Sequence, residues 1–162
     1  MSLDNDIARL SRVPLFQELN TVQVRFLAFS AMHREPRVGE ALFHEGAEAF
    51  SGFVVANGEI TLSRGEGEAK QDLATCEPGC LIGELALFVE MRRPATATAT
   101  LPTDVIEINR ALMARMLDEF PELAIRLRAF LAGRLTATVS ELRKVGQAMN
   151  RIGEGQSRFA TE

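Results

Sequence analysis

Residues 83–96 read Gly-Glu-Leu-Ala-Leu-Phe-Val-Glu-Met-Arg-Arg-Pro-Ala-Thr, and this stretch carries most of the information about the fold. Gly83 lets the backbone approach another group closely, and the residues from Leu85 to Phe88 can form one helical turn. The N–H groups at the start of such a turn attract an anion. Arg93 adds a planar fork of donors that suits two phosphate oxygens. The stretch therefore predicts a site for a small anion.

Glu84 indicates what else the ligand carries. A carboxylate beside a bare anion would repel it, but it suits a ligand that also offers hydroxyl donors next to a phosphate. We therefore expect Glu84 to accept from a sugar hydroxyl within an apolar wall. Two plainer interpretations stay open: Arg93 forms a surface salt bridge with Glu90, or Glu84 is only a carboxylate at a helix N-terminus.

Upstream of this stretch the sequence changes from helical to strand character. Apolar residues recur at helical spacing over residues 4–32, where Pro14 interrupts the run and Thr21 is a plausible N-cap. Residues 35–109 then alternate short β-forming runs with Gly, Pro and Asn, which predicts an antiparallel barrel or sandwich. Asn57-Gly58 predicts a tight type I′ hairpin between residues 53–56 and 59–62. Residues 64–68 predict a second, looser hairpin loop.

Downstream, the helical period returns at Arg110. A short helix is expected to end near Glu119, and Pro121 fits the first turn of a longer one. The longer helix carries a heptad seam with spacings 4, 3, 4, 3, 4 and 3: Leu131, Leu135, Thr138, Leu142, Val145, Met149 and Ile152. We expect residues 131–152 to form a parallel homodimer contact; the alternative is an amphipathic helix lying on its own barrel. Residues 153–162 are expected to be a flexible tail.

Composition narrows the class of protein. The 162 residues predict one domain over residues 4–152, divided into segments 4–34, 35–109 and 110–152. A net charge of −4 without a basic tract predicts no nucleic-acid binding by this chain. No apolar run is long enough for a bilayer, and the N-terminus lacks a signal-peptide pattern, so we expect a cytoplasmic protein without membrane contact.

The sequence offers no motif for catalysis or metal binding. Cys76 and Cys80 lack the paired partners that a zinc site needs, because His33 and His44 are distant in sequence. Both cysteines are interpreted as ordinary small residues near a turn. The sequence contains no P-loop and no nucleophile–base grouping in a plausible order, so we expect no enzymatic activity and no metal.

The stretch at residues 83–96 resembles the phosphate-binding cassette of the cyclic nucleotide-binding domain family. That pattern is roughly G-E-[LI]-A-L-L, four residues, then R-x-A-[ST], and the spacing here is the same. The resemblance extends to residues 15–19, 39–46 and 53–60. It implies an α+β fold: an antiparallel β-roll, or double-stranded jelly roll, with an N-terminal helical segment and a long C-terminal helix.

The resemblance also implies a role for each site residue. Glu84 would accept from the ribose 2′-hydroxyl, and Arg93 would pair with the cyclic phosphate. The cradle and its continuation would comprise Gly83, Leu85, Ala86, Pro94, Ala95 and Thr96. Thr138 would cap the adenine as a Thr does in the catabolite activator relatives; alternatively, it is a seam residue hydrogen-bonded to its own helix.

One position departs from the family pattern. The residue after the Arg usually donates its backbone N–H to the phosphate, but Pro94 has none. The lost hydrogen bond to a charged acceptor costs about 1.5–3 kcal/mol. Pro94 also removes the Thr hydroxyl that favours cGMP in some relatives, which favours cAMP.

Three interpretations follow from the resemblance. The first is a regulatory domain that binds a cyclic nucleotide and signals through its C-terminal helix. The second is a structural dimerisation module of the same fold that has lost its ligand. The third is a fragment of a larger Crp-type transcription regulator, because the residues after the seam leave no room for a helix-turn-helix.

Overall fold

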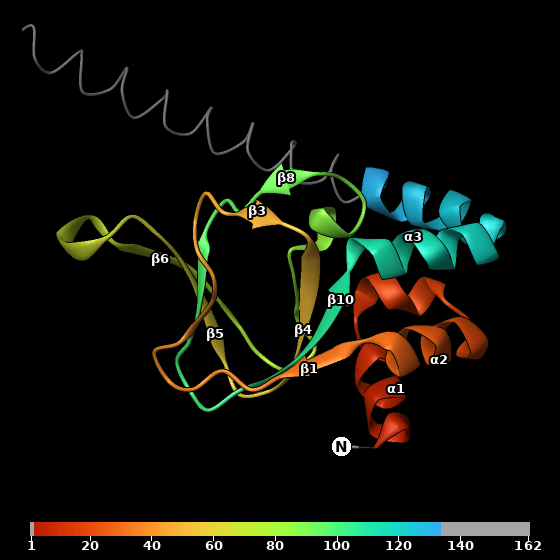
Figure 1. Ribbon diagram of the computed structural model, residues 1–162, viewed down its shortest axis with the longest axis horizontal. Coiled ribbons are helices and arrows are strands. Elements are labelled where there is room, and N and C mark those ends of the chain that lie inside the picture. The colour runs from red at the N-terminus through yellow and green to blue at the C-terminus, as the bar shows by residue number, and fades with distance from the viewer. Residues whose placement is uncertain (1, 134–162) are drawn as a thin grey trace, which may run out of the picture. The chain divides into compact units, whose positions relative to one another are not determined.

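A computed structural model describes residues 2–133 of the chain (Figure 1). The helical elements are α1 (Leu3–Ser11), η1 (Pro14–Glu18), α2 (Thr21–Ser30), η2 (Gly67–Ala69), η3 (Glu84–Leu87) and α3 (Arg110–Glu119). The strands are β1 (Met32–Arg34), β2 (Ala41–Phe43), β3 (Glu48–Ala49), β4 (Ser51–Asn57), β5 (Ile60–Arg64), β6 (Gln71–Cys76), β7 (Leu81–Ile82), β8 (Met91–Arg92), β9 (Thr96–Ala99) and β10 (Asp104–Asn109).

The chain divides into two units, residues 1–123 and 124–162. Residues 121–133 are helical, so the boundary between the units falls within this helix. Thr138, the predicted tail and most of the predicted seam over residues 131–152 lie outside the described residues. The homodimer contact and the single domain over residues 4–152 therefore stay predictions.

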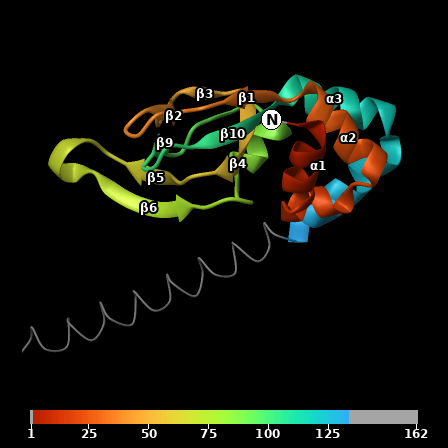
Figure 2. The same cartoon turned by 90° about the horizontal axis from the view of Figure 1, so that it is seen from below.

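The strands form a roll of antiparallel sheets. One sheet has the order β1-β10-β4-β7, a second has the order β2-β9-β5-β6, and β3 pairs with β8. Seen from two directions, the helices α1, α2 and α3 gather at one end of the roll, beside β1 and β10 (Figures 1 and 2). The predicted α+β roll with N-terminal helices and a C-terminal helix is confirmed.

The interior of the roll is an apolar cluster supplied by both large sheets. Its buried members are Leu42, Phe53, Val55, Ile60, Cys76, Ile82, Ala97, Ala99 and Val105. The small Ala97 and Ala99 of β9 are fully or almost fully buried within this cluster. Strand β4 is buried along residues 51–56, because it lies between β10 and β7 in the middle of its sheet.

Capping hydrogen bonds fix the start of α2, and one polar contact joins α1 to β1. Asn20, not Thr21 as expected, is the N-cap of α2: its side chain accepts from the Gln23 backbone N–H at 2.9 Å, and the Gln23 side chain accepts from the Asn20 N–H at 2.9 Å. The prediction was wrong by one residue. Helix α1 is tied to β1 by the side chains of Asp6 and His33, whose Oδ2 and Nε2 lie 2.7 Å apart.

The predicted hairpin at Asn57-Gly58 is also wrong. Strands β4 and β5, which flank this turn, belong to different sheets and do not pair. Gly58 has a φ of 89°, but Asn57 does not have a positive φ, so the turn is not type I′. Instead Asn57 pairs with Asp104 across the sheet, and the Glu59 N–H donates to Thr103 Oγ1 at 3.0 Å. These long-range contacts outweigh the local turn preference and send the chain from one sheet to the other.

The looser loop at residues 64–68 does join a hairpin, between β5 and β6.

Cys76 and Cys80 lie at the two ends of the turn between β6 and β7, as expected, and neither forms a disulfide. Cys76 is buried in the roll cluster, and Cys80 packs against that cluster. The hydrogen bond between the two thiols, together with burial, raises the pKa of Cys76 well above its usual range. The Cys76 thiol therefore stays protonated at neutral pH.

The corner at Gly58 gives a stability prediction with a matched control. A Cβ on Gly58 would lie 2.4 Å from Thr103 Oγ1 and 2.5 Å from the Pro102 oxygen, whereas a Cβ on Gly39, which has a similar φ of 87°, would meet nothing within 4 Å. We expect Gly39→Ala to cost about 1–2 kcal/mol for the backbone alone, and Gly58→Ala to cost at least about 1 kcal/mol more. Urea unfolding of both variants measures this difference; equal losses would contradict the tight corner.

The thiol pair gives a prediction about reactivity. Only the thiolate reacts with an alkylating agent, so the raised pKa and burial of Cys76 predict that iodoacetamide at pH 8 leaves it unmodified in the native protein. Mass spectrometry of tryptic peptides, before and after unfolding in urea, locates the modified thiol. Alkylation of native Cys76 as fast as in the unfolded chain would show that the thiol is neither buried nor held protonated.

Candidate ligand-binding site

The predicted cassette follows the short strand β7 and turns sharply at Gly83. Gly83 has φ 76° and ψ 36°, in the left-handed region, and leads directly into the 3-10 turn η3. Any Cβ at this position would lie 2.5 Å from Arg93 Nη1 and 3.2 Å from the Ser51 oxygen. Glycine is therefore required here for the backbone angle and for the space that the guanidinium occupies. The Ala86 N–H donates to the Gly83 oxygen at 3.1 Å, so this amide is already engaged.

Arg93 points into the roll and not toward solvent. Its backbone is held on both sides: its N–H donates to the Ala47 oxygen and its oxygen accepts from the Gly46 N–H, each at 2.8 Å. Only 5% of the residue is exposed. Its Nε and Nη1 are buried and have no hydrogen-bond partner among residues 2–133. The interpretation of Arg93 as a surface salt bridge with Glu90 is therefore wrong.

Burial without a hydrogen-bonding partner changes the electrostatics of this guanidinium. Desolvation lowers the pKa of Arg93, and the negative charge of Glu107 partly offsets that effect. The Arg93 Cζ lies 4.1 Å from the centroid of the Phe43 ring and 5.6 Å from that of Phe53. Buried guanidinium groups are normally paired with an anion, because transfer of an isolated charge out of water is costly. The geometry therefore fits an anionic ligand at Arg93.

A cavity of about 280 Å³ lies beside the guanidinium. Its lining contains most of the predicted site residues: Gly83, Glu84, Leu85, Ala86, Arg93, Pro94 and Ala95. Thr96 does not line it; its side-chain oxygen accepts instead from the Glu45 N–H at 2.9 Å. Glu84 is half-buried in the wall. At the rim, the exposed Arg64 donates through Nε to the Pro94 oxygen at 3.0 Å.

Sequence reasoning missed the apolar part of the wall, which consists of Phe43, Leu62, Leu81, Ile82 and Met91. These residues come from four different strands and therefore have no local motif. Their only signal in the sequence is the two-residue alternation of each strand, which says that a side chain faces inward but not which space it lines. Such a wall suits a flat, largely apolar ring.

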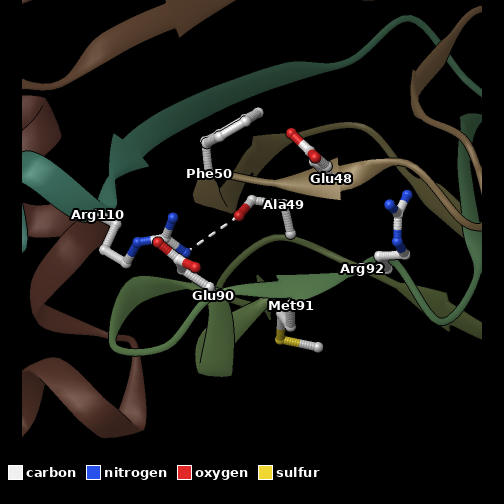
Figure 3. A pocket seen from close by; sticks show the side chains of 7 residues that line it. All are labelled: Glu48, Ala49, Phe50, Glu90, Met91, Arg92 and Arg110. Carbon is white, nitrogen blue, oxygen red and sulfur yellow. Dashed lines mark hydrogen bonds between the residues drawn. The ribbon is translucent and has the colours of Figure 1, made fainter.

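A larger hollow of about 430 Å³ lies elsewhere, and Figure 3 shows its lining of Glu48, Ala49, Phe50, Glu90, Met91, Arg92 and Arg110. Both of its cations are bound to backbone carbonyls. Arg92 Nη1 donates to the Gly46 oxygen at 2.9 Å. Arg110 Nη1 donates to the oxygens of Val89 at 2.8 Å, Ala49 at 3.2 Å and Ala86 at 3.4 Å. The smaller cavity, with its unpartnered guanidinium nitrogens, is therefore the better candidate site.

Arg110 was not singled out by the sequence, yet it connects the cassette to a helix. It is the first residue of α3, and its three carbonyl partners include Ala86 in η3 and Val89 just after it. A movement of the cassette would therefore pull on the start of α3. This contact connects the cassette directly to α3.

The described part of the chain offers no metal centre and no membrane span. Among residues 2–133, no three His, Cys, Asp or Glu side chains come together in a way that could hold a metal ion. In the same residues, no helix has the length and apolar character needed to cross a bilayer.

Comparisons with known proteins agree with this architecture. A family model described as "Cyclic nucleotide-binding domain" matches residues 34–120. The chain is 30% identical over 142 residues to a cyclic AMP receptor protein of Thermus thermophilus, covering 86% of this chain and 66% of that one. It is 28% identical over 104 residues to a lysophospholipase NTE1 of Chaetomium globosum, covering 64% of this chain and 7% of that one. The chain therefore spans less than two thirds of either relative.

A solved structure is similar as well. The N-terminal domain of a transcriptional regulator from Streptomyces coelicolor superimposes with a TM-score of 0.73 at 34% identity, covering 80% of this chain and 93% of that one. The matched family segment comprises most of the roll, the whole cassette and α3. On this evidence, the chain belongs to the cyclic nucleotide-binding domain family.

Proposed function

We propose that this domain binds a cyclic nucleotide inside the roll, cAMP rather than cGMP, and that it reports the bound ligand through its C-terminal helix. It acts as a regulatory domain in the cytoplasm and carries no catalytic step of its own. The observation that carries the proposal is the buried guanidinium of Arg93, which lies beside a cavity of about 280 Å³ and whose Nε and Nη1 have no hydrogen-bond partner in the described part of the chain.

The cyclic phosphate binds at Arg93. A phosphate diester has one negative charge shared by two exocyclic oxygens, and the adjacent Nε and Nη of one guanidinium can donate to both. Gly83 leaves the space in which that guanidinium lies. Binding would supply the hydrogen bonds that the two buried nitrogens lack, and this gain is the main source of affinity.

The sugar and the base occupy the rest of the cavity. Glu84 is half-buried in the wall and accepts from the ribose 2′-hydroxyl. The apolar side chains of Leu62, Leu81 and Met91 face the base, which gains from leaving water. Thr138, which lies outside the described residues, caps the adenine in this proposal. The absence of a Thr hydroxyl at Pro94 and the name of the Thermus thermophilus relative both favour cAMP over cGMP.

Signalling follows from a shift of the cassette. When the bound phosphate pulls Arg93 and the cassette toward itself, Ala86 and Val89 move with the cassette. The oxygens of both residues accept hydrogen bonds from Arg110 at the start of α3. The two states then differ in the position of α3 and the following helix. A homodimer through residues 131–152 would turn that difference into a change at the dimer contact.

A ligand-free dimerisation module is the competing function, and Pro94 is the observation that favours it. Pro94 lines the cavity but has no N–H to offer a phosphate. Under this alternative the roll is only a scaffold, and no cyclic nucleotide binds.

Removal of the buried charge of Arg93 should affect ligand affinity and stability in opposite directions. We expect Arg93→Met to raise the Kd for cAMP at least about thirtyfold, because the phosphate loses its charged donors. The same change should stabilise the unliganded protein by about 1 kcal/mol, because an apolar side chain replaces a buried guanidinium whose Nε and Nη1 lack hydrogen-bond partners among the described residues. Titration calorimetry and urea unfolding measure the two effects.

Arg92→Met is the matched control, because Arg92 is exposed and its guanidinium binds the Gly46 oxygen outside the cavity. Its Kd for cAMP should change less than about threefold. Unchanged cAMP affinity in Arg93→Met, with a loss of stability typical of a core truncation, would make Arg93 a structural residue and remove the proposed phosphate site.

A further prediction concerns the backbone N–H that Pro94 lacks. Replacing Pro94 by Ala restores a backbone donor next to Arg93, so we expect the affinity for cAMP to rise about tenfold or more. Titrations of the unmodified protein and of Pro94→Ala with cAMP and cGMP test this. If neither protein binds either nucleotide, the ligand-free module is the correct function; binding that Pro94→Ala leaves unchanged would place the phosphate away from this position.

A further inference from the structure

We propose that Phe43 is the positioning residue for Arg93: its ring holds the guanidinium at the cavity in the place where a ligand phosphate would meet it. This inference rests on the proposed function, because it states how the phosphate site is kept ready. It assigns a role to a residue outside the cassette, in another part of the cavity lining.

The geometry of the contact is that of a cation over an aromatic ring. The Arg93 Cζ is 4.1 Å from the Phe43 centroid, well inside the roughly 6 Å within which such pairs attract. Phe53 lies behind, with its ring centroid 5.8 Å from that of Phe43 and 5.6 Å from the Arg93 Cζ. The guanidinium therefore lies closest to Phe43, and Phe53 supports that ring.

The surroundings offer Arg93 little else. Its Nε and Nη1 donate no hydrogen bond. The acidic group that acts on it electrostatically, Glu107, lies 3.8 Å from the guanidinium of Arg34 and forms an ion pair there. Arg34 in turn lies 5.7 Å from the Phe53 centroid. The face of Phe43, 4.1 Å from the Arg93 Cζ, is thus a close and favourable contact for the buried charge of Arg93.

Strand β2 directs Phe43 to this place by an irregularity in its pairing. Ala41 pairs with Thr98 and Phe43 pairs with Ala97, so the register shifts between them. In a regular strand, Leu42 and Phe43 would face opposite sides of the sheet. Here Leu42 belongs to the roll cluster and Phe43 packs against the same cluster. The bulge re-aims one side chain, which is a common use of bulges next to functional sites.

Without this ring, the guanidinium would leave the cavity for water, because the charge of Glu107 offsets its desolvation only in part. Ligand binding would then have to bring Arg93 back, and the Kd would rise. A leucine at position 43 keeps much of the apolar volume but has no aromatic face, whereas a tyrosine keeps the face. These two variants separate positioning from packing.

The test is a double-mutant cycle on the chain itself. We expect Phe43→Leu to raise the Kd for cAMP about tenfold, and Phe43→Tyr to keep it within about threefold of the unmodified value. In urea unfolding without ligand, Phe43→Leu should lower the equilibrium constant for folding about tenfold more in the unmodified background than in Arg93→Met, where no cation remains above the ring.

The outcomes separate this inference from the proposed function. The role of Phe43 is overturned if Phe43→Leu costs the same stability in both backgrounds. It is also overturned if Phe43→Tyr raises the Kd for cAMP as much as Phe43→Leu does. In either case cAMP binding still stands. Absence of cAMP binding by the unmodified protein overturns the proposed function, and with it the positioning of Arg93 for a phosphate. A tenfold rise in Kd together with the background-dependent loss supports both.

Discussion

The structure depends on one buried guanidinium. Arg93 is pinned through its backbone to Ala47 and Gly46, and its side chain enters the roll where only glycine at position 83 leaves room for it. A charge in that position is costly unless something compensates for it. The shape of the cassette, the aromatic face of Phe43 and the adjoining cavity can all be understood as the surroundings that this one group requires.

The same arrangement connects the candidate site to α3. The cassette is a short, sharp turn whose far end, at Ala86 and Val89, is held by Arg110. Because Arg110 begins α3, its hydrogen bonds connect the roll to that helix, and both cations of the surrounding hollow, Arg92 and Arg110, donate to backbone oxygens. The apolar cluster of the roll stabilises the fold. The cavity, in contrast, contains the guanidinium of Arg93, a buried charge that a core optimised for stability would exclude.

The sequence predicted what local chemistry determines. The cassette spacing identified Gly83, Glu84 and Arg93, and the change of period placed the helices and the roll. Contacts between distant residues were beyond its reach. Asn57-Gly58 has the composition of a tight hairpin, but the turn is fixed instead by the pairing of Asn57 with Asp104 and by a hydrogen bond to Thr103. Phe43 lies under Arg93 because of a bulge in β2, and Arg110 meets three carbonyls from separate segments; neither contact leaves a pattern in one sequence.

A crystal structure of the chain grown with cAMP is the most direct measurement of the central claim. The account predicts the cyclic phosphate inside the roll, with its two exocyclic oxygens about 2.7–2.9 Å from Nε and one Nη of Arg93. A phosphate bound elsewhere, or a roll in which Arg93 stays stacked on Phe43 with no nucleotide at saturating cAMP, would contradict it.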